Sequence, residues 1–272
     1  MLTKVEVSTT QGQTLVLPLE YTDNGYLIQE IEGLDPVKAV IASASFANQD
    51  GEQFQSSRRE ARNIIIKLGL EKGAAGSVRD LRTRLYAIFM PKATVRLRFF
   101  SDDEPEVEIY AKVESCFAPL FVQEPIATIS LLCHQPDFYI PTPVVISGET
   151  VSGITEFQVN YEGSVETGIK LTLLLTRDLN SFTIYHRSSD NSLNTLEFKE
   201  PVLLGDMLVI STISGDKGAT LTRAGSIKSV LYGITPVSNW INLFPGTNHI
   251  RVHADGAAIP FSIDYTTKLG GL

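Results

Sequence analysis

The stretch from Trp240 to Gly256 constrains the fold of this chain more than any other feature. Proline fixes φ and glycine accepts positive φ, so Pro245-Gly246 predicts a sharp turn after a short apolar segment. Residues 249–254 then alternate apolar and polar side chains, which is the period-2 pattern of a half-buried strand, before Asp255-Gly256 turns again. The stretch contains no catalytic group in an activated setting. It predicts a β-sandwich with a structural or binding role.

The same pattern extends through the second half of the chain. Short strands separated by turn residues, with no helix between them, indicate a sandwich. We predict strands at 157–161, 170–176, 181–185, 196–198, 207–211, 220–223, 238–243, 249–254 and 259–266. Two prolines in Pro141-Thr142-Pro143 favour extended backbone and mark a joint. We therefore expect two domains, 1–140 and 141–272.

The first half is also predicted to be mainly β, with one short helix. Strands are expected in a hairpin over 5–19, at 26–31 and 63–70, and in a three-stranded meander over 95–133. Ser77 can cap a helix over 78–89, and Asp80 stands at the third helical position of a capping box. Apolar residues fall on one face of that helix at 3-4-3 spacing. This half is thus a β-sandwich domain with one helix.

A polar segment, 47–62, separates two apolar strands of the first half. Asp50-Gly51 predicts a two-residue hairpin turn at its tip, and Phe54 is its only aromatic residue. Long polar segments inside compact domains are usually functional or disordered. Two interpretations stay open: a solvated loop, or a β-hairpin arm that docks on a neighbouring subunit. In the second, Asp50, Gly51, Phe54, Arg58, Arg59 and Arg62 are the candidate interface residues, with Phe54 as anchor and the arginines seeking carboxylates.

Composition excludes several classes of protein. The net charge is −8 and the isoelectric point about 5.1, so the chain lacks the basic field that nucleic-acid recognition needs. No apolar run approaches a membrane span, and the first residues show no secretory signal, so we expect synthesis in a cytoplasm and no membrane insertion. Cys116 and Cys133 are expected to be free thiols, with one bridge as the open alternative.

No catalytic, metal-binding or cofactor-binding constellation emerges from the residues. His249 and His253 share a face of a predicted strand about 13 Å apart, too far to bind one ion. Cys133 and His134 are neighbours, but nothing brings a nucleophile and a base together. Nucleotide-binding glycine motifs are missing. We therefore expect no enzyme, cofactor or metal.

The order and spacing of several motifs resemble the distal tail proteins of siphophages. The resembling segments are 31–36, Asp50-Gly51, 58–66, the helix over 78–89, 131–139, 205–210 and 243–250. The resemblance implies a hexameric ring at the tail tip or baseplate of the virion. In that ring the first domain lines the channel and its hairpin embraces the next subunit. It also implies a galectin-like or carbohydrate-binding-module-like second domain.

The partners that the resemblance implies are other copies of the chain, the tail tube protein and a tail hub or tail-associated protein. A receptor-binding protein or a host glycan is a further expected partner. A rival interpretation makes the second sandwich a carbohydrate-binding module for host-surface glycans. Aromatic residues such as Tyr185, Tyr232 and Trp240 would then form a stacking platform, whereas the alternative places them in the core.

Overall fold

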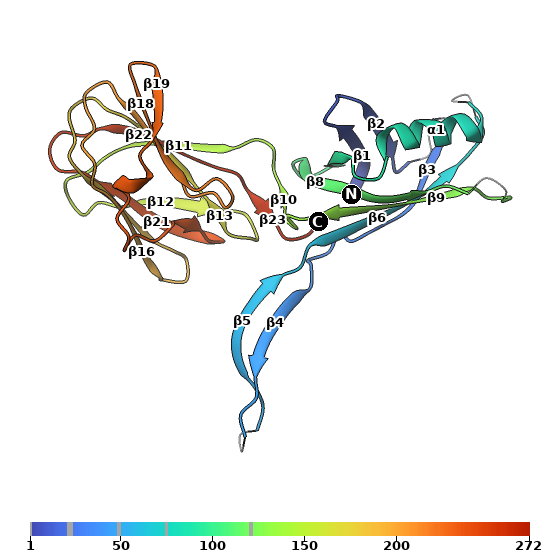
Figure 1. Ribbon diagram of the computed structural model, residues 1–272, viewed down its shortest axis with the longest axis horizontal. Helices are drawn as coiled ribbons and strands as arrows, with labels where there is room; N and C mark the ends of the chain where they lie inside the picture. The colour runs from blue at the N-terminus through green and yellow to red at the C-terminus, as the bar shows by residue number, and fades with distance from the viewer. Residues whose placement is uncertain (1, 21–23, 48–49, 74–75, 120–121) are drawn as a thin grey trace. The chain divides into compact units, whose positions relative to one another are not determined.

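The computed structural model divides the chain into two compact units (Figure 1). The structure describes residues 2–20, 24–47, 50–73, 76–119 and 122–272. Unit 1 comprises Met1–Pro141 with Leu269–Leu272, and unit 2 comprises Thr142–Lys268. The last four residues thus differ from the expected division, because β23 (Lys268–Leu269) pairs with β10 (Phe138–Tyr139) in unit 1. Independent folding of unit 2 stays a prediction, which calorimetry of a 142–268 fragment would test.

Unit 1 is built on one antiparallel sheet. Its strands are β1 (Leu2–Thr9), β2 (Thr14–Pro18), β3 (Tyr26–Glu32), β6 (Arg62–Leu70), β7 (Thr94–Ser101), β8 (Val107–Phe117) and β9 (Ile126–Cys133). They follow the order β2-β1-β7-β8-β9-β6-β3, and β10 and β23 complete nine strands among the described residues. The predicted 5–19 hairpin and the β7–β8–β9 meander are both present.

Helix α1 (Val78–Ile88) covers the sheet of unit 1 (Figure 1). The Ser77 hydroxyl accepts from the Asp80 backbone N–H, and the Asp80 carboxylate accepts from the Ser77 N–H, which confirms the predicted capping box. Leu81, Leu85 and Ile88 are buried in the core that the helix shares with the strands. The helix closes the core on that face.

Unit 2, in which every residue is described, is a sandwich of two antiparallel sheets around one core. The six-stranded sheet has the order β11-β22-β14-β17-β18-β19, and the four-stranded sheet has the order β12-β21-β15-β16. The first contains β11 (Val144–Glu149), β22 (Pro260–Tyr265), β14 (Lys170–Leu174), β17 (Met207–Ser211), β18 (Gly218–Arg223) and β19 (Ser226–Ser229). The second contains β12 (Phe157–Tyr161), β21 (Gly246–His253), β15 (Phe182–Arg187) and β16 (Leu193–Phe198). A short pair, β13 (Thr167–Gly168) and β20 (Asn242–Leu243), and the 3-10 turn η1 (Leu231–Gly233) complete the unit.

The predicted strand over 238–243 was wrong in most of its length, since only Asn242–Leu243 pairs as a strand. Residues 235–239 instead cover the free edge of β16. The Asn239 N–H donates to the Thr195 carbonyl at 2.8 Å, and the Ser238 hydroxyl accepts from the Glu197 N–H at 2.9 Å. An open edge would invite pairing with another chain, so this segment protects the sandwich.

Asn248 holds the Pro245-Gly246 turn in place. Its side chain is fully buried, and its amide nitrogen donates to the carbonyls of Phe244 at 2.7 Å and Gly246 at 3.0 Å. Its oxygen accepts from the Phe244 N–H at 3.1 Å and faces His186 Nε2 at 3.0 Å. The two carbonyls fix the amide orientation, so His186 must donate through Nε2.

We expect unit 2 to lose stability in acid because of His186. Its ring is buried, its Nδ1 has no partner among the described residues, and burial lowers its pKa. The unfolded chain, with a pKa of about 6.5, therefore takes up a proton before the folded one does. Stability is full above about pH 6.5 and falls, by at most about 1.4 kcal/mol per pH unit, until the folded pKa is reached.

Urea unfolding followed by tryptophan fluorescence measures this loss, because the single tryptophan, Trp240, packs against the core of unit 2. His186→Gln should flatten the profile between pH 7 and 5. Equal profiles for the wild type and His186→Gln would contradict the assignment.

Candidate functional site: an exposed hairpin arm

Two strands of unit 1 pair with each other and with no other described strand. They are β4 (Ala39–Ala44) and β5 (Gln53–Arg59), and with the residues between them they form a hairpin that extends from the sheet (Figure 1). We call residues 39–59 the arm. The predicted hairpin over 47–62 was placed too late in the chain, and its residues 48 and 49 lie outside the described residues. The apolar segment 39–46 belongs to the arm because its register pairs Val40 with Arg58.

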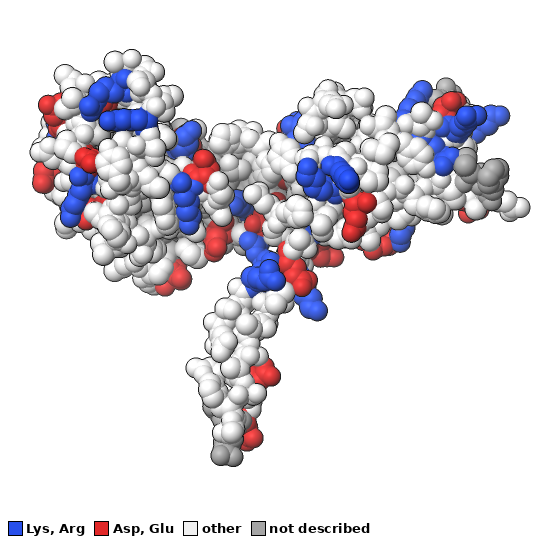
Figure 2. All heavy atoms as spheres, in the orientation of Figure 1, with Lys and Arg blue, Asp and Glu red and all other residues white. Residues whose placement is uncertain are grey.

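The arm exposes apolar side chains along its length. Every residue of β5 is exposed, and the exposed fractions of Ile41, Phe46 and Phe54 are 65%, 52% and 63%. Most of the arm is uncharged in the space-filling view, and basic side chains gather at its base (Figure 2). An isolated two-stranded hairpin is marginally stable in water. Exposed apolar groups on such an element indicate a surface that another protein covers.

Asp50 and Gly51 lie at the tip of the arm, as the sequence predicted, and both are exposed. Gly51 has φ of +84°, which only glycine adopts without strain. Phe54 stands opposite Ser43, next to a register shift between Ala42 and Ser43. Such bulges twist a ribbon and redirect its side chains.

Arg62 lies at the root of the arm and is 1% exposed. Its guanidinium donates to the carbonyls of Gly33 and Asp35 at 2.5 and 2.6 Å, and to Pro136 and Gly270 at 2.6 and 2.5 Å. It also stands 4.4 Å from the centre of the Phe138 ring. Desolvation lowers its pKa, but an arginine remains charged at every physiological pH. We call Arg62 and its four carbonyl partners the root.

The geometry of the root requires glycine at positions 33 and 271. Gly33 has φ of +85°, and a Cβ there would lie 2.0 Å from the Asn63 carbonyl oxygen. At Gly271 a Cβ would lie 2.8 Å from Pro36 Cδ. Both approaches bring backbone close enough for the carbonyls to converge on one guanidinium, which a side chain would prevent.

The candidate interface residues therefore separate into two groups. Asp50, Gly51, Phe54 and Arg58 are exposed on the arm. Arg59 donates to the Asp137 carboxylate, with one contact of 3.0 Å, so it already has a carboxylate in its own chain. The prediction that Arg62 is an interface residue was wrong. Its side chain is buried and donates its hydrogen bonds to carbonyls of unit 1, so it is not free to contact a neighbour. The sequence reasoning did not include Ile41 and Phe46 among the candidate interface residues, although both are exposed on the arm.

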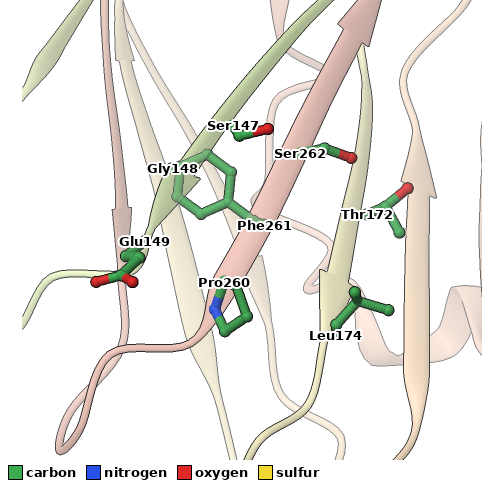
Figure 3. A pocket seen from close by; sticks show the side chains of 8 residues that line it. All are labelled: Ser147, Gly148, Glu149, Thr172, Leu174, Pro260, Phe261 and Ser262. Carbon is green, nitrogen blue, oxygen red and sulfur yellow. The ribbon is translucent and has the colours of Figure 1, made fainter.

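Unit 2 carries a pocket of about 470 Å³ on the outer face of its six-stranded sheet (Figure 3). Three hydroxyl groups, from Ser147, Ser262 and Thr172, stand opposite one another on β11, β22 and β14. Leu174 and Pro260 form an apolar end of the pocket, and Glu149 adds a carboxylate. Of the aromatic residues named as a possible stacking platform, Tyr232 is 68% exposed, while Tyr185 and Trp240 are half-buried.

The described part of the chain offers no metal site and no activated thiol. No group of His, Cys, Asp or Glu there could hold a metal ion, and both cysteines are free. Burial raises the pKa of Cys116 to about 11 and that of Cys133 to about 12, which keeps both as protonated thiols. No described helix is long and apolar enough to cross a membrane.

Comparisons with known proteins relate the chain to phage tail proteins. A solved structure of the SPP1 Dit protein, titled as a paradigm of the hub adsorption apparatus in phages infecting Gram-positive bacteria, shares its fold. The TM-score is 0.69 at 16% identity, over 97% of this chain and 98% of that one. A chain of the phage P2 baseplate matches with a TM-score of 0.51 at 9% identity, over all of both chains. The family model of the phage tail protein RIFT-related domain matches residues 19–133. The chain thus carries a phage tail protein domain over residues 19–133 and shares the fold of the SPP1 Dit protein.

These matches support the resemblance to the siphophage distal tail proteins, and the structure confirms the mainly β fold predicted from the sequence. The matched domain is one of phage tail proteins, which supports a structural role in the tail or baseplate of the virion. No curated protein matches it. The matched family domain contains the arm and its root apart from Gly270 and Pro136, since it ends at residue 133.

Proposed function

We propose that the chain assembles into a closed ring, a hexamer, that joins the tail tube to the baseplate or tail-tip hub. The observation that carries this proposal is the arm, which exposes Ile41, Phe46 and Phe54 yet is held at its root by a buried arginine. An element on one side of a subunit that docks on a different surface of the next makes heterologous contacts, and such contacts close rings. On a chain of net charge −8, Arg58 finds carboxylates on a neighbouring copy.

The partners proposed for the ring are the tail tube protein on one side and a tail hub or tail-associated protein on the other. A receptor-binding protein is a further proposed partner. We propose a purely structural role, with no enzymatic activity or cofactor, in keeping with the structural character of the related tail proteins.

Native mass spectrometry across a range of concentrations tests the ring. The expected result is a species of six 29.9 kDa chains in equilibrium with monomer, with few intermediate species because closure completes every contact at once. A chain that remains monomeric at high concentration and within purified virions would overturn the proposal.

Carbohydrate recognition by unit 2 is the second candidate function. The hydroxyl-lined pocket favours it, because sugars are recognised by a few directed polar groups beside an apolar surface (Figure 3). A glycan array probed with the full chain tests this, with a Thr172→Val/Ser262→Ala variant as control. A signal that this variant retains would exclude the pocket as the binding site.

A further inference from the structure

The outer face of the four-stranded sheet of unit 2 carries Arg187 and Arg251, together with the carboxylates of Glu156 and Glu197. Alternation along β21 puts Ile250 and Val252 in the core and His249, Arg251 and His253 on the opposite face. On β15, Tyr185 stands opposite Arg251 and Arg187 opposite His249. Strand β21, whose alternating sequence predicted the sandwich, therefore places one arginine and two histidines on one surface.

Arg251 differs from the other arginines of unit 2, where all residues are described. Arg187 has Glu156 at 2.9 Å and Arg223 has Asp206 at 2.6 Å, while Arg177 donates to backbone carbonyls. No described carboxylate forms an ion pair with Arg251. Its contacts are a carbonyl of Gly153 at 3.5 Å and the ring of Tyr185, whose centre lies 4.1 Å from the guanidinium carbon.

We propose that this face binds the anionic group of a polysaccharide, a phosphate or a carboxylate, through Arg251. A guanidinium presents a planar fork that matches both groups with two parallel hydrogen bonds. Stacking on Tyr185 holds the fork in place, so little side-chain freedom is lost on binding. His249 and His253 lie two residues away on either side, and their ring nitrogens stand 3.7 Å from the carboxylates of Glu156 and Asp255, so Arg251 is the group left for the ligand.

The surroundings favour a sugar over a protein as the occupant. The neighbouring outward positions carry the hydroxyl groups of Thr183 and Thr195, and the carboxylate of Glu197 there is paired with Lys199 at 3.0 Å. The large exposed apolar residue of this face, Leu193, stands at its rim, on the first position of β16. Protein interfaces place aromatic or aliphatic anchors at their centre. Hydroxyls around a fixed guanidinium instead suit a hydrated, charged saccharide.

The net charge is −8, so the chain as a whole repels polyanions. Binding of an anionic oligomer would therefore indicate a specific site and not a general attraction. Calorimetric titration of the full chain would use three probes: a glycerol phosphate oligomer, a galacturonic acid oligomer and a neutral glucose oligomer. We expect at least one anionic oligomer to bind and the neutral one not to bind. Tighter binding of the glycerol phosphate oligomer would identify a phosphate ligand, and tighter binding of the galacturonic acid oligomer a carboxylate ligand. Equal affinities would identify a site that accepts either anionic group.

Arg251→Gln should weaken binding about tenfold or more, because it removes two charge-assisted hydrogen bonds. Arg251→Lys keeps the charge without the fork and should retain part of the affinity. Lys228→Gln removes one exposed positive charge from β19 of the other sheet and is the matched control. Thermal unfolding of each variant verifies its fold.

Three results would overturn the proposal. The first is that neither anionic oligomer binds the wild type. The second is that Lys228→Gln weakens binding as much as Arg251→Gln. The third is that a polyglutamate peptide of equal charge binds more tightly than both sugars, which would make this face a protein interface. None of these results depends on ring formation, so the proposed ring stands or falls separately.

Discussion

Removing the arm is expected to leave a folded monomer that no longer forms rings. The deletion replaces residues 41–57 by Asn-Gly, which joins Val40 to Arg58, a directly opposed pair in the hairpin. The residues removed are almost all exposed, so the unfolding free energy of the monomer should change by less than about 0.5 kcal/mol. Ring formation should be abolished, because the arm carries its apolar contacts. Native mass spectrometry and urea unfolding at low protein concentration measure the two effects.

Two point variants test whether assembly depends on an aromatic residue of the arm or on any exposed aromatic residue. Phe54 on the arm and Phe117 on β8 are exposed to similar extents, 63% and 67%. Phe54→Ser should weaken assembly at least tenfold, as expected for an aromatic anchor worth about 2 kcal/mol, whereas Phe117→Ser should assemble normally. A deletion variant that still forms complete rings would reduce the arm to a solvated loop. One that does not fold would show that the arm is part of the core sheet.

Replacing Arg62 by methionine should destabilise unit 1 by about 3–5 kcal/mol. The substitution leaves four converging carbonyls without a donor in a buried site, and the loss of one partner from a buried polar network is costly in this range. Arg62→Lys should be intermediate, since an ammonium group cannot reach four oxygens in a planar fork. Arg58→Met, on the exposed part of the arm, is the control and should change stability by less than about 0.5 kcal/mol.

Calorimetry combined with fluorescence assigns this effect to a unit. The single tryptophan reports on unit 2, so its unfolding midpoint should not move in Arg62→Met, while the calorimetric transition of unit 1 falls. Equal stability of Arg62→Met and the wild type would mean that water replaces the guanidinium without cost, contrary to the burial of the site.

Features fixed by neighbouring residues were predictable from the sequence. The Ser77–Asp80 capping box, the 5–19 hairpin and the turn at Gly246 each depend on residues a few positions apart. The site depended on distant pairings instead. Arg62 was assigned to an interface because a charge is normally exposed, and nothing local reveals that carbonyls 27 to 208 positions away converge on it.

The apolar residues of the arm were equally hard to place from the sequence. Residues 39–46 are apolar and extended, which is typical of a core strand, and sequence periodicity cannot distinguish a core from a surface that a second chain covers. Strands β11 and β23 were missed because each is defined by its partner: β11 by β22, and β23 by β10.

The pairing of β10 with β23 has an evolutionary consequence. The chain leaves the sheet of unit 1 at Tyr139 and returns to it at Leu269, on two strands that lie side by side. Unit 2 is therefore an insertion between adjacent strands, and its two ends need be only about 5 Å apart. Recombination that exchanged the segment 142–267 for another domain with neighbouring termini would leave every strand of the unit 1 sheet, and the arm, in place. The fold thus allows unit 2 to be replaced in evolution while unit 1 is kept.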